Sequence, residues 1–118
     1  MRNLAPDILR QRLLIEGYYS VTVGRKEVEE FLTGIAVSLE LRTYGPPIVH
    51  EPGGIGKPEN QGFDAFIPLI DSGISLYVWS ARRFFAAVLF TCKSFAVSRA
   101  LDFTRQHFGS EELSHREF

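Results

Sequence analysis

The chain has 118 residues, with 13 lysines and arginines against 14 aspartates and glutamates, and its formal net charge is −1. Hydrophobic residues form 45% of the chain and charged residues 23%, which predicts one domain with a buried core and excludes a disordered chain. Because no cluster of lysine and arginine is longer than Arg82–Arg83, we expect no nucleic-acid partner.

Cysteine usage and hydropathy indicate in which cellular compartment the protein is expected. A single cysteine, Cys92, permits no internal disulfide, which is typical of a reducing compartment. The longest apolar run, residues 84–90, is too short to span a bilayer, and Pro6 and Asp7 interrupt the stretch where a secretory signal would be apolar. We therefore expect a cytoplasmic protein with no membrane partner.

The first part of the chain predicts a strand, a short helix and a second strand. Aromatic and β-branched residues over 13–23 favour a strand. From Lys26 to Gly34 apolar residues recur at helical spacing behind glutamates in the opening turn, which predicts a helix that ends near Gly34. Apolar residues then alternate with a period of two over 35–41, which predicts a strand.

The second part predicts a long loop, three strands and a helix. Glycine and proline crowd residues 45–62, so we expect a loop there. Turn-like segments separate the three strands that follow, 63–70, 74–79 and 84–92. Ser94 is a candidate N-cap for a second helix, which Gly109 ends. This order predicts an α+β two-layer sandwich, a mainly antiparallel sheet with helices on one face.

Single residues carry little functional signal. The histidines, His50, His107 and His115, lack metal-ligand spacing, so we predict no metal site and expect solvated or locally bonded side chains. On residue type alone, Cys92 at the end of an apolar strand is more typical of a packed thiol than of a reactive one.

A combination of short motifs is more informative. Its parts, in chain order, are Gln61–Gly62, Asp71–Ser72, Ser75, Trp79, Phe90–Cys92 and Arg116–Glu117. This pattern over residues 11–118 resembles the bacterial type of S-adenosylmethionine decarboxylase, a pyruvoyl enzyme. In that family the serine after an acidic residue becomes the pyruvoyl group, and its separation from a cysteine equals that between Ser72 and Cys92. The resemblance implies one domain over 1–118, with self-cleavage between residues 71 and 72.

The chemistry that the resemblance implies uses the chain's own residues. Ser72 Oγ would attack the Asp71 carbonyl to form an ester, in a turn that Gly73 permits, and elimination would then leave a pyruvoyl cofactor at the new N-terminus, with no metal. The pyruvoyl carbonyl would form a Schiff base with a small-molecule amine and accept the electrons released with carbon dioxide. Cys92 would be the proton donor.

The chain departs from the family pattern beside the serine. Gly73 replaces a histidine, and Tyr77 replaces the histidine associated with processing. Asp64 stands where the family has a serine. We interpret Tyr77 and Asp64 as candidate catalytic residues, with Asp64 as the replacement base, as a partner for a cationic substrate group, or as a solvated carboxylate.

The resemblance implies decarboxylation of S-adenosylmethionine in polyamine synthesis by a homodimer of processed protomers. Glu16, Asp64 and Trp79 are the candidate substrate-binding residues. Because two carboxylates also suit a smaller cation, decarboxylation of arginine or ornithine is one alternative. An unprocessed, non-catalytic relative that binds a ligand or an active paralogue is the other.

Overall fold

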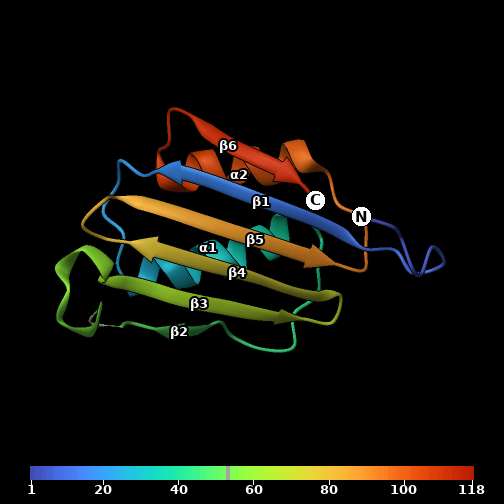
Figure 1. Ribbon diagram of the computed structural model, residues 1–118, viewed down its shortest axis with the longest axis horizontal. Helices are drawn as coiled ribbons and strands as arrows, with labels where there is room; N and C mark the ends of the chain where they lie inside the picture. Colours follow the sequence, from blue (N-terminus) through green and yellow to red (C-terminus); the bar gives the residue numbers. More distant parts are fainter. Residues whose placement is uncertain (53) are drawn as a thin grey trace.

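The computed structural model describes residues 1–52 and 54–118, and within them six strands form one sheet in the order β2-β3-β4-β5-β1-β6 (Figure 1). Every pair of neighbouring strands is antiparallel. The strands are β1 (Gln11–Tyr18), β2 (Ile48–His50), β3 (Gly62–Leu69), β4 (Ser72–Trp79), β5 (Phe84–Thr91) and β6 (Leu113–Glu117). Two helices, α1 (Arg25–Ser38) and α2 (Val97–Phe108), cover one face of the sheet, so the predicted α+β two-layer sandwich is confirmed.

The core lies between the helices and the sheet. The Phe85 ring of β5 stacks on the Phe108 ring of α2 with centroids 4.1 Å apart, and the Phe31 ring of α1 lies 5.0 Å from Phe108. All three side chains are fully buried. Because such aromatic pairs add about 0.5–1.5 kcal/mol beyond the burial of their surface, this cluster ties both helices to the centre of the sheet.

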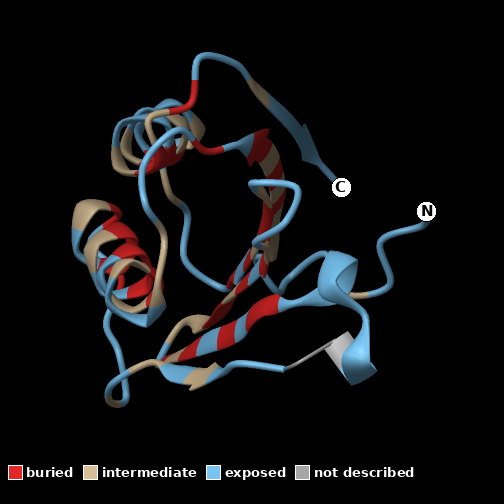
Figure 2. Cartoon of the chain, turned by 90° about the vertical axis from the view of Figure 1, so that its left-hand side faces the viewer, coloured by how far each residue is buried: buried red, intermediate tan, exposed pale blue. Residues whose placement is uncertain are grey.

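The other side of the sheet carries neither helix (Figure 2). We call it the open face, and its larger side chains alternate along each strand with those of the core. They are Leu14 and Tyr18 of β1, Ile48 of β2, Phe66 of β3, Tyr77 and Trp79 of β4, and Phe84, Val88 and Phe90 of β5. Tyr18, Ile48, Phe66, Tyr77 and Phe90 are each 38–60% exposed, so the open face is aromatic and accessible in the single chain.

The strand predicted over 35–41 is wrong, because α1 continues to Ser38. Ile35 and Ala36 are fully buried and extend the helical face that Phe31 and Leu32 begin. Val37 is 72% exposed, which fits helical spacing and breaks the alternation that had favoured a strand.

Gly34 lies inside α1 and does not end it. A Cβ at this position would overlap the ring of Phe103 in α2, so the glycine permits close approach of the two helices. A glycine that serves helix packing looks the same in sequence as one that ends a helix.

Other boundaries also differ from the prediction. The loop predicted over 45–62 contains β2 and two short 3-10 turns, η1 (Gly54–Gly56) and η2 (Pro58–Asn60), while residue 53 lies outside the described residues. The three strands predicted after the loop correspond to β3, β4 and β5. Ala96, not Ser94, precedes α2, whereas Gly109 ends it in the left-handed conformation as predicted. The sequence did not predict β6.

Candidate active site

The β3–β4 turn carries the bond that the family resemblance marks for cleavage. Leu69, the last residue of β3, pairs with Ser72, the first of β4, so Ile70 and Asp71 form the turn. Ser72 has φ 114°, a conformation that residues with a side chain rarely adopt. The backbone is therefore strained at the serine that would become the cofactor.

Cys92 lies against this turn because β5 pairs with β4 in a register that sets Thr91 opposite Ser72. The Ser72 Oγ and the Cys92 Sγ are 3.2 Å apart. The Cys92 amide donates a hydrogen bond of 2.9 Å to the Asp71 carbonyl oxygen. Cys92 is exposed, so its thiol is not packed in the core.

Arg42 joins the same turn from the segment after α1. Its Nη2 lies 3.4 Å from Asp71 Oδ1, and its amide lies 3.5 Å from Asp71 Oδ2. The Asp71 side chain is 13% exposed and that of Arg42 is 67% exposed. Sequence reasoning missed Arg42, since no motif or periodicity links it to residues about thirty positions further along the chain.

Gly73 of β4, where the family has a histidine, is covered by a ring from β3. A Cβ built at Gly73 would overlap the outer ring atoms of Phe66. The space beside Ser72 that a side chain at position 73 would use is therefore occupied by Phe66.

A second group, which includes three of the predicted site residues, forms a row across the open face. His50 of β2 pairs with Asp64 of β3, Asp64 with Tyr77 of β4, Tyr77 with Ala86 of β5, and Ala86 with Glu16 of β1. We call these five residues the cross-sheet row. Direct cross-strand partners place their Cβ atoms about 4.5–5.5 Å apart, so Asp64 has His50 on one side and Tyr77 on the other.

The cross-sheet row borders a shallow groove of about 330 Å³ that His50, Asp64 and Tyr77 line together with Phe66. The sequence analysis considered His50 only as a solvated or locally bonded side chain and did not place it beside Asp64. The signal that could have found it is weak, since β2 has only three residues between prolines and glycines.

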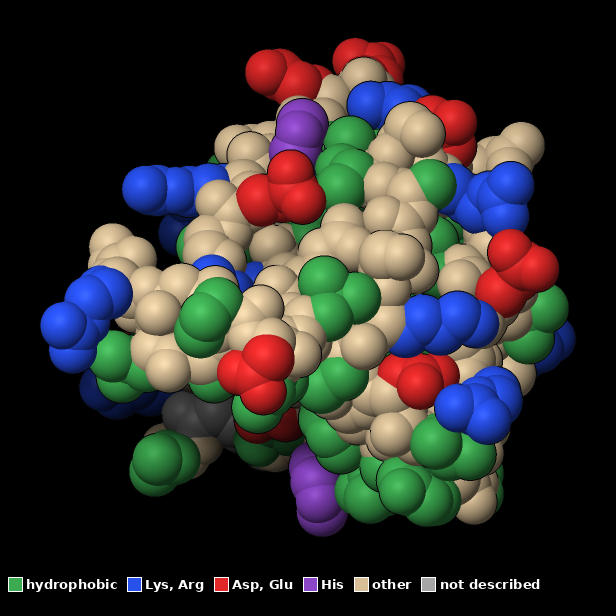
Figure 3. Space-filling view, turned by 90° about the vertical axis from the view of Figure 1, so that its right-hand side faces the viewer, with side chains coloured by type: hydrophobic (Ala, Val, Ile, Leu, Met, Phe, Trp, Pro, Cys, Tyr) green, Lys and Arg blue, Asp and Glu red, His purple; other side chains and the backbone are tan. Residues whose placement is uncertain are grey.

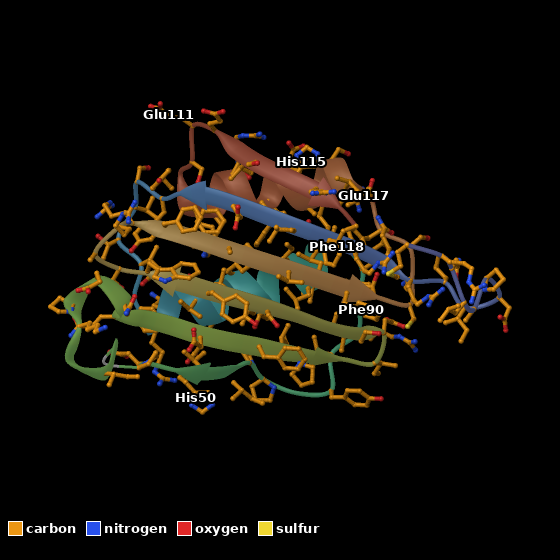
Figure 4. The ribbon with its side chains drawn as sticks, in the orientation of Figure 1. His50, Phe90, Glu111, His115, Glu117 and Phe118 are labelled. Atoms are coloured by element: carbon orange, nitrogen blue, oxygen red, sulfur yellow. The ribbon has the colours of Figure 1, made fainter. Side chains whose placement is uncertain are left out.

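The two groups lie at different places along the strands. Tyr77 follows Ser72 by five residues on β4, which is about 16 Å at the rise of a strand. Figure 4 shows Phe90 near the end of β5 that leads to Cys92, and His50 toward the opposite end of the sheet. One copy of the chain therefore does not bring Asp64, Tyr77 or Glu16 to Ser72.

Trp79 lies still further from Ser72, at the far end of β4. Its ring centroid is 5.4 Å from that of Phe84, which is 5.3 Å from that of Tyr18. These three aromatic residues, with Glu59 and Arg82, line a hollow of about 350 Å³. The Trp79 hollow can hold a flat or apolar group beside charged side chains.

Figure 3 shows the right-hand side of the molecule, where β5 ends. Acidic and basic side chains are interspersed over the visible surface.

Among residues 1–52 and 54–118, no three histidine, cysteine, aspartate or glutamate side chains group as metal ligands. Over the same residues, no helix is long and apolar enough to cross a membrane.

Comparison with known protein families gives the class of protein. Residues 12–118 match the S-adenosylmethionine decarboxylase family, and the chain belongs to it.

The solved structure of the adenosylmethionine decarboxylase from Aquifex aeolicus VF5 has a similar fold. The TM-score is 0.73 at 18% sequence identity, and the match covers 94% of this chain and 89% of that one. No curated protein matches the chain.

Proposed function

We propose that the chain is a pyruvoyl-dependent decarboxylase that generates its cofactor from Ser72 and acts on S-adenosylmethionine in cytoplasmic polyamine synthesis. The observation that carries this proposal is the arrangement at one turn. A strained Ser72 has its hydroxyl 3.2 Å from the Cys92 thiol, while the Cys92 amide holds the adjoining Asp71 carbonyl.

The first step of self-processing moves the Asp71 acyl group from nitrogen to oxygen. Ser72 Oγ adds to the Asp71 carbonyl carbon, the peptide C–N bond breaks, and the nitrogen takes the hydroxyl proton to leave an ester and a free amine. The Cys92 amide, already 2.9 Å from the carbonyl oxygen, stabilises the negative charge that develops there. Release of backbone strain at Ser72, of order 1–3 kcal/mol, favours the shift.

The second step is an elimination. A base removes the Cα proton of Ser72, and the Cβ–O bond of the ester breaks. The leaving group is the main-chain α-carboxylate of Asp71, which becomes the C-terminus of fragment 1–71. The new N-terminal enamine tautomerises to an imine, and water hydrolyses it to release ammonia and leave the pyruvoyl carbonyl. Asp64 is the proposed base, with Tyr77 and His50 beside it in the cross-sheet row.

A second copy of the chain is needed to bring that base to Ser72. In one copy Asp64 pairs with Tyr77, which lies about 16 Å from Ser72 along β4. We propose a homodimer that packs through the open face, where Tyr18, Phe66, Tyr77 and Phe90 are each 38–60% exposed. The twofold axis of this dimer would lie in the interface and run across the strands, midway between the cross-sheet row and Ser72. Such an axis places the cross-sheet row of each copy opposite the Ser72 turn of the other copy.

The pyruvoyl group, once formed, supplies an electrophilic carbonyl that binds a substrate amine and accepts the electrons released with carbon dioxide. Ser72 fits as its precursor, since it begins a strand in a conformation that cleavage relaxes. The Cys92 Sγ lies 3.2 Å from the Ser72 Oγ, and Cys92 is the proposed proton donor to the substrate carbon. Glu16 and the Trp79 hollow are the proposed contacts for the substrate's cationic and flat parts.

Replacement of Cys92 by alanine is expected to reduce turnover more than cleavage, because the thiol acts after carbon dioxide has left while the backbone amide that holds Asp71 remains. The processed fraction is measured by denaturing electrophoresis and turnover by carbon dioxide release. Abortive transamination of the pyruvoyl group is expected to rise. Equal turnover of Cys92→Ala and the wild type would contradict the role of the thiol.

The alternative role of Asp64, as the partner of a substrate cation and not as the processing base, is tested by Asp64→Asn, which in that case still cleaves. The substitution keeps the shape of the side chain and removes its charge. If Asp64 holds the distal cation of arginine or ornithine, the substitution weakens binding of that substrate by about 1.5–3 kcal/mol, the range for a charged hydrogen bond. Carbon dioxide release is measured from S-adenosylmethionine, arginine and ornithine in parallel, per processed chain. Turnover of S-adenosylmethionine alone, unchanged per processed chain by the substitution, would reject the basic amino acids. A cleaved protein that releases carbon dioxide from none of the three would contradict the proposed substrate.

A further inference from the structure

We propose that residues 39–43, the first part of the segment between α1 and β2, position the cleavage site for the first step of self-processing, with Arg42 and Glu40 as their contact points. We call residues 39–43 the connector. The inference rests on the proposed self-cleavage at Ser72 and assigns a role that lies outside the residues at which bonds form and break.

The connector holds the β3–β4 turn through both its backbone and its Arg42 side chain. The Ile70 amide donates a hydrogen bond of 2.9 Å to the Arg42 carbonyl, and Thr43 forms a β-bridge with Leu69. The Arg42 guanidinium and amide reach the two oxygens of Asp71 at 3.4 and 3.5 Å. The residue whose carbonyl must be attacked is therefore held at its side chain, while the residue before it is held at its amide.

The connector also holds the turn that carries Cys92. Lys93 Nζ donates a hydrogen bond of 2.8 Å to the Glu40 carbonyl oxygen, and Glu40 has φ 58°, which turns the chain sharply after α1. On the other side of Cys92, the buried Thr91 hydroxyl donates a hydrogen bond of 2.7 Å to the Lys93 carbonyl. Cys92 is thus fixed by its two neighbours, one of which is anchored to the connector.

These contacts make the connector the common support of two turns from different parts of the sheet. The acyl shift needs the Asp71 carbonyl to stay against the Cys92 amide while the Ser72 hydroxyl adds to it. A misplacement of about 1 Å in such an arrangement reduces a rate about a hundredfold. The Arg42 side chain is 67% exposed, so solvent screens its ion pair with Asp71, whose side chain is 13% exposed. Loss of the Arg42 contact is therefore expected to act more on this geometry than on global stability.

The test compares Arg42→Met and Lys93→Met with the wild type. Freshly purified full-length chain is incubated, and the appearance of fragments 1–71 and 72–118 is followed by intact mass. Each substitution is expected to slow cleavage about ten- to a hundredfold, and Arg42→Lys, which keeps the charge, is expected to recover part of the rate. Arg105→Met is the control, since it removes an arginine–aspartate ion pair of nearly the same length, 3.5 Å, within α2 and away from the β3–β4 turn. It is expected to cleave at the wild-type rate.

Hydroxylamine separates positioning from general weakening of the protein, because it cleaves an ester between residues 71 and 72 but not the peptide bond under mild conditions. In Arg42→Met the ester is expected not to accumulate, so hydroxylamine does not restore cleavage. In Asp64→Asn the ester is expected to accumulate, so hydroxylamine does release the fragments. A thermal unfolding transition shows whether each variant is folded. If Arg42→Met is not folded, the cleavage rate of Arg42→Lys is used in its place.

The outcomes are distinct. Cleavage of Arg42→Met and Lys93→Met at the wild-type rate would overturn the role of the connector and leave the proposed function intact. Release of fragments from Arg42→Met by hydroxylamine would also overturn it, because Arg42 would then act after the ester. A wild-type chain that never cleaves would instead remove the proposed function itself.

Discussion

The Ser72→Ala variant is expected to remain one chain of 118 residues under conditions in which the wild type separates into fragments 1–71 and 72–118. Alanine has no hydroxyl to add to the Asp71 carbonyl and no oxygen to leave in the elimination, so both steps stop. Intact mass is the measurement. The summed mass of the two wild-type fragments should equal that of the uncut chain plus one water and minus one ammonia, whereas simple hydrolysis would add the water alone.

Ser75→Ala provides the matched control for this variant, because it removes a hydroxyl from the same strand without touching the turn. It is expected to cleave like the wild type. A wild-type protein that keeps its full mass after prolonged incubation would contradict self-processing and would leave the unprocessed, ligand-binding relative as the better interpretation.

Co-expression of Ser72→Ala with Asp64→Asn is expected to restore cleavage that neither variant shows alone. In a mixed dimer the intact Asp64 of the first chain faces the intact Ser72 of the second, so only the Asp64→Asn chain is cut. With random pairing of equal amounts, about half of the Asp64→Asn chains should be cleaved. Different affinity tags on the two chains identify which one yields the fragments and show that mixed dimers form.

The control replaces the first chain by one that carries both substitutions, which has no intact Asp64 to offer and should restore nothing. Absence of cleavage in mixed dimers of the two single variants would contradict a base supplied by the second copy. Full cleavage of Asp64→Asn on its own would exclude Asp64 as that base.

Much of the sheet could be predicted from the sequence because its strands alternate strongly and turn residues separate them. The helix α1 could not be bounded correctly, since Gly34 and the alternation after it match two structures equally and only contact with Phe103 decides between them. The strand β6 is short and nearly all exposed, so its residues carry no apolar pattern and its pairing with β1 comes from the tertiary fold.

The candidate site also has parts that could be predicted from the sequence and parts that could not. Ser72 and Cys92 could be matched from their separation because hairpin-like pairing of β4 with β5 converts a fixed spacing into contact. Asp64 and Tyr77 could be named but not placed, since their distance from Ser72 follows from strand length and not from motif. The contact of Arg42 with Asp71 and the pairing of His50 with Asp64 could not be predicted, because they depend on where the segment after α1 and the short strand β2 meet the sheet.

The ring of Phe66 over Gly73 makes the order of evolutionary change matter at this site. A chain that regained the family's histidine at position 73 while Phe66 was present would have to push that ring toward solvent, next to the strained serine. A smaller residue at position 66 would remove the obstacle, and histidine at 73 would then fit without it. Histidine at position 73 is therefore expected to be better tolerated when position 66 carries a smaller residue than phenylalanine.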